Sequence, residues 1–524
     1  MGEVPAARAR QSKSVSPGKV SQMGISGALI DPPSYLGDRR FRQMTGWSIN
    51  FRRLHLINAL FISLAGLWHQ HRGVLLRLSA LVTILLTSVY LAPRIAMGNR
   101  MLTYILLLYL GAAVAVILLK WPPLGLVALV AASLYVPFSI GTGTAVSVNI
   151  SVLLVGFLGG LWLLDMLVRQ KRITFVYSRP VVAIVVFVLV AIIAFGVGLL
   201  PLVPLAQPAS LPAQIGGLAV FILSALVFLL VTHQVDDLRW LQAITWVFLG
   251  LGAVYIAGRL IPALGTTRFF QYGAHGSLFW IWMVALAFSQ AFINKDLKPF
   301  WRLALIGLVF ATLYVGFFQG RDWASGWAPG LVAVIAIIWL RSWRLGLVIT
   351  LVSVAGKFIF DPGLAADLVA ADQYSIDSRA EAYRIVLELA RANPLLGLGM
   401  SNYYHYTPLI PIWGYYVPFN SHSQYIDLIA QTGLIGLGCF FWFVAEVGRL
   451  GWRLRTQVSG GFATAYVYGA LGGLAGMLVA GYLGDWVLPF VYNIGLIGMR
   501  ASLLGWMFLG GLLVIEKCTQ NRVV

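Results

Sequence analysis

Apolar runs of about twenty residues recur along the chain, from roughly Gly73 to Ile515. One α-helix needs a run of about this length to cross the hydrocarbon core of a bilayer, which is about 30 Å thick. Lipid offers no hydrogen bonds to the backbone, so each run must form a helix that pairs its own polar groups. The pattern predicts an all-α fold, a polytopic transmembrane helical bundle of twelve to fourteen spans. The candidate spans begin near residues 73, 102, 123, 148, 180, 216, 240, 276, 302, 323, 344, 424, 461 and 494.

The composition fits this class and excludes two others. Hydrophobic residues make up 59% of the chain and charged residues only 10%, which no water-exposed globular surface can accommodate. The net charge of +19 raises the possibility of nucleic-acid binding. The basic residues, however, stand in short clusters between the apolar runs, as the positive-inside rule produces. We therefore expect a lipid bilayer and no nucleic acid as partner. Two cysteines, Cys439 and Cys518, are too few for a disulfide framework.

The distribution of charge between the runs predicts the orientation. Loops that hold several Lys or Arg, such as residues 169–179 and 295–302, alternate with loops that hold none, such as residues 141–147 and 201–214. Basic loops stay on the cytoplasmic side. We expect an inner (plasma) membrane protein with both termini in the cytoplasm and with residues 361–423 on the extracytoplasmic side.

The same reading divides the chain into segments. Residues 1–53 hold nine Lys or Arg against three acids, and this composition predicts a disordered basic cytoplasmic tail. The following apolar stretch is short for a span and is flanked by arginines, which favours an interfacial helix at residues 54–72. The remaining predicted segments are transmembrane helices at 73–360, an extracytoplasmic loop with the active-site residues at 361–423, transmembrane helices at 424–515, and a cytoplasmic tail at 516–524.

The predicted outer loop contains a helix signal. Ser378 and Glu381 have the spacing of a capping box, so we expect a helix that begins at Arg379 with Ser378 as its N-cap. Asn393-Pro394 would end this helix. Its apolar residues fall on one face, which predicts a short amphipathic helix outside the bilayer. The apolar positions are Ala382, Ile385, Val386, Leu389 and Ala390.

Two arginines are candidates for binding an anion. Arg379 would stand in the first turn of a helix, where free amides and the helix dipole favour a phosphate or pyrophosphate. The alternative is a solvated arginine that pairs with a neighbouring acid. Arg321 lies in a short outer turn at the membrane surface, where a charge costs free energy unless it is paired or functional. The alternative there is an interfacial ion pair with Asp322.

Three of the seven histidines, His275, His405 and His422, are predicted to face outward. His422 stands where the chain re-enters the membrane, and the near-neutral pKa of histidine suits a general base for a sugar hydroxyl. A structural histidine is the alternative. His275 could be a turn residue at the mouth of a helix. The acidic residues of the outer loops lack metal-ligand spacing, so we expect no metal and no cofactor.

Several segments together resemble one family, the O-antigen ligase and O-antigen polymerase superfamily of polytopic membrane glycosyltransferases. The likeness covers roughly residues 270 to 445. The sequence departs from the usual pattern at Gly320, where the family has Ser, at Tyr383, where it has Trp, and at Ser423, where it has Asn. The segments that carry the resemblance are Gly320-Arg321, Asp377-Ser378-Arg379 with Tyr383, Asn393 to Gly399, and His422 to Gly436.

The resemblance implies transfer of a glycan from an undecaprenyl-pyrophosphate carrier to a glycan, lipid or protein acceptor at the outer membrane face. It implies that Arg321 and Arg379 engage the pyrophosphate and that His422 lies near the acceptor hydroxyl. A polysaccharide polymerase of the same superfamily and a membrane solute transporter are the alternatives, and transport would favour charges at mid-membrane. The residues predicted to bind substrate are Gly397, Gly399, Asn402, Tyr383, Arg384 and His275.

Overall fold

A computed structural model describes residues 100–141, 147–270, 274, 276–320, 323–360 and 377–520. The chain divides into two compact units, residues 1–102 and 103–524, and almost everything described here belongs to the second. The predicted tail at 1–53, the predicted interfacial helix at 54–72 and the predicted span near residue 73 lie outside the described residues. They stay predictions.

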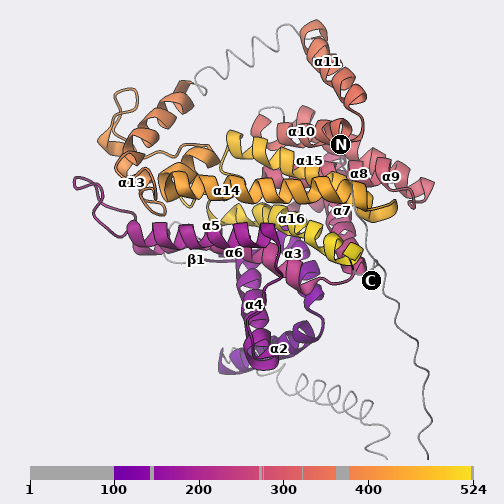
Figure 1. The fold of residues 1–524 in the computed structure, drawn as a ribbon, viewed down its shortest axis with the longest axis horizontal. Coiled ribbons are helices and arrows are strands. Elements are labelled where there is room, and N and C mark those ends of the chain that lie inside the picture. Colours follow the sequence, from indigo (N-terminus) through magenta and orange to yellow (C-terminus); the bar gives the residue numbers. More distant parts are fainter. Residues whose placement is uncertain are drawn as a thin grey trace, which may run out of the picture. The chain divides into compact units, whose positions relative to one another are not determined.

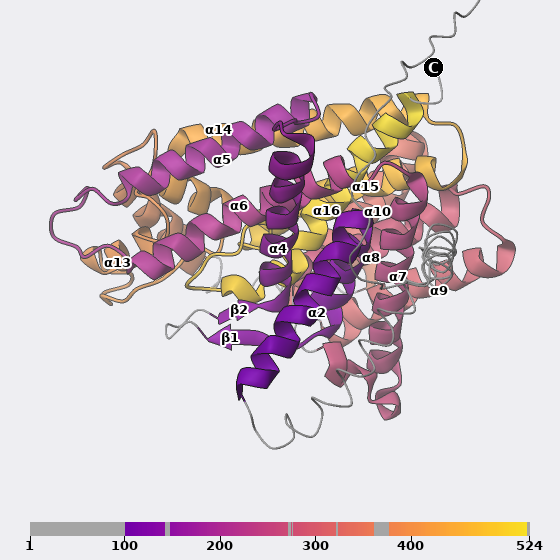
Figure 2. The same cartoon turned by 90° about the horizontal axis from the view of Figure 1, so that it is seen from below.

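The described part is a bundle of helices with one small β-ribbon (Figures 1 and 2). The ribbon pairs β1 (Ser139–Gly141) and β2 (Ser147–Asn149) in antiparallel register. The helices begin close to the predicted residues. They are α2 (Arg100–Lys120), α3 (Pro122–Tyr135), α4 (Ile150–Leu164), α5 (Arg179–Val197), α6 (Leu211–Gln234), α7 (Leu238–Leu260), α8 (Ser277–Ile293), α9 (Pro299–Tyr314), α10 (Ala324–Arg341), α11 (Trp343–Phe360), α13 (Tyr403–Tyr406), α14 (Gln424–Gln457), α15 (Gly461–Leu483) and α16 (Met499–Gln520), with a further helix at residues 377–390.

The described helices confirm a polytopic transmembrane bundle. Nine of them are long and apolar enough to cross a membrane, and α2 with α3 supplies a tenth if the pair is one broken span. The chain bends by 119° between the two helices of this pair. Pro122 starts the second helix, a position that suits proline because it has no amide hydrogen to donate. The total of twelve to fourteen spans stays a prediction, since residues 1–99 are not described. Residues 516–520 of the predicted tail continue α16.

Close helix packing forms the core of the bundle. α8 and α15 contact each other and both contact α10, while α14 packs against α5 and α15 (Figure 1). Small residues on α15 allow this approach. A Cβ added at Gly472 would lie 2.7 Å from the Ala333 carbonyl oxygen, and one at Gly476 would lie 2.7 Å from the Pro329 carbonyl oxygen. The glycines of α15 therefore serve close helix packing.

A break in α14 shapes the end of the bundle at which this helix begins. Gly433 has φ 68° and ψ −171°, which interrupts the helical hydrogen bonds. The segment of residues 394–398 replaces them: Leu434 N donates to the Pro394 carbonyl at 2.9 Å, and Leu398 N donates to the Ala430 carbonyl at 2.7 Å. The two segments that carried much of the family resemblance are thus bonded to each other. We call this end, with the start of α14, the end of α15 and the helix of residues 377–390, the site end.

Candidate active site

The helix of residues 377–390 lies with its apolar face on the bundle. Its five predicted apolar positions are all buried, and Ile385 and Val386 are fully so. The predicted cap is wrong. Ser378 is already helical, and Glu381 pairs with Arg384 at 2.7 Å instead of reaching back to the start of the helix. The guanidinium three residues ahead offers the carboxylate a charged partner, which an amide cannot match.

Arg379 projects from the described start of this helix toward the end of α15. Its Nη1 donates to the Leu483 carbonyl oxygen at 3.1 Å, and its side chain is half-buried. A carbonyl at a helix C-terminus carries partial negative charge and has no partner within its own helix. This bond holds the guanidinium at the site end, and one guanidinium has further N–H groups with which to bind an anion.

His422 occupies a strained turn directly before α14. Its φ of 50° lies in the left-handed region that non-glycine residues seldom adopt. The two neighbouring serines hold the turn. Ser423 N donates to Ser421 Oγ at 3.1 Å, and Ser421 Oγ lies 2.7 Å from a carboxylate oxygen of Asp427. Strain of this kind persists where the surroundings fix it, and such positions cluster at functional sites.

Asp427 anchors this turn from inside the bundle. Its carboxylate is fully buried, and Oδ1 also accepts a hydrogen bond from the Tyr403 hydroxyl at 2.5 Å. Tyr403 in turn accepts a bond from Ser421 N at 3.3 Å. Asp427 Oδ2 is buried without a hydrogen-bond partner among the described residues. The network runs from α13 through Asp427 to the serine beside His422, and it fixes the backbone on which the histidine stands.

The charge of Arg379 affects the pKa values of both Tyr383 and His422, so the three side chains lie near one another. Loss of hydration and then the positive charge of Arg379 lower the pKa of His422. Burial raises the pKa of Tyr383, which is hydrogen-bonded to the Ser423 side chain and also senses Arg379. The lowered pKa favours the neutral form of the His422 imidazole, which is the form that a general base requires. A cation and a neutral base therefore share one small region of the surface.

Among the three histidines that the structure describes, only His422 lacks a hydrogen bond to its ring. His405 Nε2 lies 3.0 Å from the Tyr492 hydroxyl. His233 uses both ring nitrogens, with Nε2 accepting from Val176 N at 2.8 Å and Nδ1 lying 2.7 Å from the Leu229 carbonyl. The ring of His422 remains available for a substrate.

Three other predicted substrate-binding residues are occupied by the protein itself. Gly397 and Gly399 have φ of 74° and 85° and are buried. A Cβ on Gly397 would meet the α14 backbone at its break, and one on Gly399 would meet the Gly198 backbone. The Asn402 amide bridges the carbonyls of Gly198 and Leu398 at 2.8 and 2.9 Å and accepts from Ala209 N. These contacts explain the residue types without a ligand.

The remaining candidates lie apart from His422 or outside the described residues. Arg384 is exposed and pairs with Glu381 and Glu388 on the outer helix face, so it belongs to a solvated surface. Arg321 and His275 are not described. Their neighbours Gly320 and Ala274 line a cavity of about 320 Å³ at the site end. Among the described residues, no group of His, Cys, Asp and Glu could hold a metal ion.

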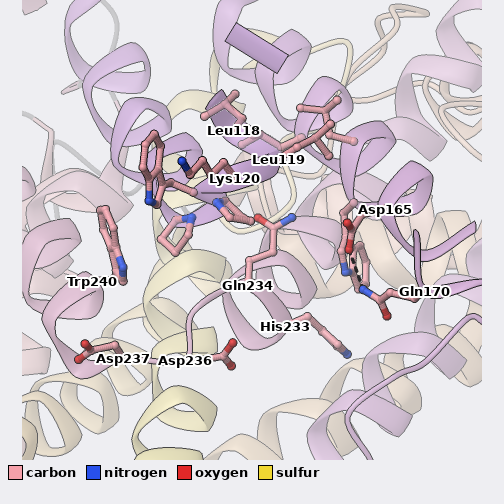
Figure 3. Close-up of a pocket in the computed structure, with 16 residues that line it drawn as sticks. Leu118, Leu119, Lys120, Asp165, Gln170, His233, Gln234, Asp236, Asp237 and Trp240 are labelled. Carbon is pink, nitrogen blue, oxygen red and sulfur yellow. Dashed lines mark hydrogen bonds between the residues drawn. The ribbon is translucent and has the colours of Figure 1, made fainter. Parts of the chain in front are cut away.

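A second cavity, of about 340 Å³, lies at the opposite end of the bundle. Figure 3 shows the residues that line it. Lys120, Asp165 and His233 contribute to its wall. α6 separates the two ends, since Ala209 just before this helix bonds Asn402 while His233 stands in its last turn. A helix of 24 residues is about 36 Å long. This cavity therefore cannot share a ligand with His422.

The chain was compared with known protein families. Residues 300–441 match the O-antigen ligase family. The match confirms the resemblance to the O-antigen ligase superfamily, and it supports a ligase-like or polymerase-like glycosyltransferase in a multi-pass membrane protein that acts on lipid-linked glycans. None of the curated proteins compared with the chain matches it. The matched segment contains Arg379, Tyr383 and His422.

Several residues of the site end escaped the sequence analysis. Tyr403 and Ser421 read as ordinary loop residues, and nothing in the sequence connects Leu483 with Arg379, which is 104 positions away. Two acids did carry a signal, because Asp427 and Asp485 are charges in or near apolar runs. Asp427 lies five residues beyond His422. Asp485, fully buried beside the end of α15, accepts from Phe490 N at 2.7 Å, and burial raises its pKa to about 6.

Proposed function

We propose that this protein transfers a glycan from an undecaprenyl-pyrophosphate carrier to an acceptor hydroxyl at the outer face of the inner membrane. The observation that carries the proposal is the proximity of Arg379 to His422: the His422 ring has no hydrogen bond among the described residues, and loss of hydration and the Arg379 charge lower its pKa. The O-antigen ligase match over the same residues supports it. The acceptor is a glycan, a lipid or a protein hydroxyl, and both chain termini face the cytoplasm.

In the proposed reaction, the acceptor oxygen attacks the anomeric carbon of the first donor sugar from the face opposite the pyrophosphate. The bond between that carbon and the pyrophosphate oxygen breaks, and the leaving group keeps the electron pair. Arg379, and by the family resemblance Arg321, bind the developing charge on the pyrophosphate. His422 accepts the proton of the attacking hydroxyl and becomes an imidazolium. The product has inverted configuration, and none of these steps calls on a metal ion.

Two arginines on one helix provide a direct test. The full-length protein is reconstituted in proteoliposomes with lipid-linked glycan extracted from the cells that make it, and glycan transfer is measured. Arg379→Ala is expected to abolish transfer, because the leaving pyrophosphate loses its cation. Arg384→Ala, the matched control on the solvated face, is expected to retain it. Near-normal transfer by a folded Arg379→Ala protein would refute the proposal.

The products of the same assay identify the acceptor class. A ligase attaches the glycan to a lipid or protein and leaves its length unchanged, whereas a polymerase lengthens the lipid-linked chain. The residues at the site end serve either reaction, because both use the same leaving group and an acceptor hydroxyl.

A further inference from the structure

The cavity of about 320 Å³ at the site end is walled mainly by aromatic rings. Its large side chains are four tryptophans, one tyrosine and one arginine, with Ala274 and Val315 completing the side-chain wall. Trp323 and Trp486 meet edge to face with centroids 5.4 Å apart. The six residues, called here the aromatic cavity, are Tyr255, Arg259, Trp280, Trp323, Trp327 and Trp486.

These tryptophans differ from those of an interfacial belt. Belt tryptophans sit among lipid headgroups with their rings exposed, as do Trp301, Trp343 and Trp452 here, which are 58%, 61% and 55% exposed. Trp280 is only 5% exposed and donates its Nε1 hydrogen to the Ala274 carbonyl at 3.1 Å. Trp323, Trp327 and Trp486 line the same cavity and are only partly exposed. Anchoring to lipid does not explain the buried Trp280 or its hydrogen bond.

The polar atoms of the wall indicate what the cavity is built to hold. Trp486 Nε1 is buried and has no hydrogen-bond partner among the described residues. Arg259 places a guanidinium against the Tyr255 hydroxyl, with Nη1 at 3.3 Å from its oxygen. A buried N–H without a partner costs about 1 to 3 kcal/mol, so an isoprenoid chain would leave the Trp486 N–H unsatisfied. A hydroxyl oxygen of a ligand would satisfy it, and the remaining N–H groups of Arg259 could donate to a second one.

A sugar ring has both kinds of surface. Its C–H faces carry partial positive charge and stack on the negative faces of indole rings, while its hydroxyl oxygens accept from N–H donors. The volume lies at the lower end of the range for ligand pockets, about 300 to 1,000 Å³, which suits one ring better than a whole oligosaccharide.

The position of the cavity connects it with Arg379. Trp486 follows Leu483, the acceptor of the Arg379 hydrogen bond, by three residues. Three residues of extended chain span about 10 Å. The first sugar of a lipid-linked glycan is joined directly to the pyrophosphate, so a pyrophosphate at Arg379 would hold that sugar within reach of the cavity.

We propose that the aromatic cavity binds the pyranose ring attached to the pyrophosphate of the lipid-linked donor. The inference rests on the proposed function for the identity of the donor. Stacking on Trp327 and a hydrogen bond from Trp486 Nε1 orient the ring, so the cavity selects a glycosylated carrier over the bare one.

The test uses full-length protein in nanodiscs prepared without glycoside detergents, with two radiolabelled probes. One is undecaprenyl pyrophosphate, and the other is the same lipid carrying a single N-acetylhexosamine. The wild-type protein is expected to bind the glycosylated probe about tenfold more tightly. Trp327→Leu, which keeps apolar volume but removes the aromatic face, is expected to erase this preference and leave the affinity for the bare carrier unchanged.

Two further variants separate stacking from hydrogen bonding and from folding. Trp486→Phe keeps a ring but removes the N–H, and a loss of about fivefold for the glycosylated probe alone is expected. Trp301→Leu, an exposed tryptophan on α9, is the matched control and should change neither affinity. Equal weakening of both probes by Trp327→Leu would assign the cavity to the isoprenoid. An unchanged sugar preference in both cavity variants would also overturn the inference.

A third probe distinguishes failure of the proposed pyrophosphate donor from failure of the proposed sugar site. The methyl glycoside of the same N-acetylhexosamine competes at millimolar concentration if the cavity binds sugar without the carrier. Competition that Trp327→Leu abolishes, together with no binding of bare carrier by the wild type, would support the sugar site and refute the pyrophosphate donor. If neither the glycoside nor the glycosylated carrier shows a sugar-dependent effect, the cavity is not a sugar site.

Discussion

His422 and His233 both stand at an end of a long membrane helix, yet their rings have opposite surroundings. Both ring nitrogens of His233 are engaged, and its ring lies against Trp162 with centroids 4.9 Å apart. Figure 3 shows His233 among the residues that line the cavity of about 340 Å³. His422 has a left-handed backbone and a ring without a hydrogen bond among the described residues. The availability of the ring, and not its place on a helix, separates the two histidines.

The largest expected effect separates these histidines by function. His422→Ala removes the proposed general base, so kcat for glycan transfer is expected to fall by about 10² to 10⁴. His233→Ala should leave kcat within about twofold and lower the free energy of unfolding by about 1 to 3 kcal/mol, because the variant leaves Val176 N without its partner. Initial rates in proteoliposomes and thermal melts measure the two effects. Equal loss of kcat in both variants would contradict the claim that His422, and not His233, acts in glycan transfer.

The next effect concerns Arg379. Arg379→Lys keeps the charge but loses the fork that matches pyrophosphate, so transfer is expected to fall by about 10- to 100-fold and to stay above that of Arg379→Ala. Arg384→Lys serves as control, because its ion pairs on the solvated helix face contribute little. The ratio of rates for the two lysine variants is the readout, and a ratio near one would show that the guanidinium of Arg379 has no special role.

A smaller effect is expected from the support beneath His422. Ser421→Ala removes the hydroxyl that links the strained turn to Asp427, and we expect kcat to fall about tenfold with little change in KM, since the imidazole is misplaced but the donor still binds. Ser459→Ala, in the loop before α15, should change neither constant. A matched rise in KM would indicate that Ser421 contacts substrate instead of positioning the histidine.

The smallest effect is a shift in pH dependence. Burial and the charge of Arg379 lower the pKa of His422, so the neutral base persists below the ordinary histidine pKa and activity is lost only as the pH falls through that lowered value. Removing the charge in Arg379→Gln should raise the pKa of His422. NMR titration of ring-labelled histidine, with His422 assigned by comparison with His422→Gln, measures the shift. An unchanged or lower pKa would contradict the proximity of the two side chains.

Patterns within short stretches of sequence predicted the features that depend on neighbouring residues, namely the helices and their buried faces. The apolar runs located the described helices, and the spacing from Ala382 to Ala390 predicted the face that the helix of residues 377–390 buries. The break at Gly433 was not predictable, because the hydrogen bonds that compensate for it come from residues 394–398. The hydrogen bond between Arg379 and the Leu483 carbonyl was not predictable either, because the two residues are 104 positions apart in the sequence. A sequence does not reveal whether a glycine such as Gly397 or Gly399 makes room for a substrate or for another backbone, and the structure shows a neighbouring backbone against each.

The central claim is that His422 is the base of a glycan-transfer site, and chemical analysis of the cell envelope tests it most directly. A deletion strain is complemented with the wild type, with His422→Ala or with His233→Ala, each produced at equal level, and lipid-linked and transferred glycan are quantified. We predict that the wild type and His233→Ala restore the transferred product, whereas His422→Ala leaves the glycan on its lipid carrier. Full restoration of the transferred product by His422→Ala would contradict the account.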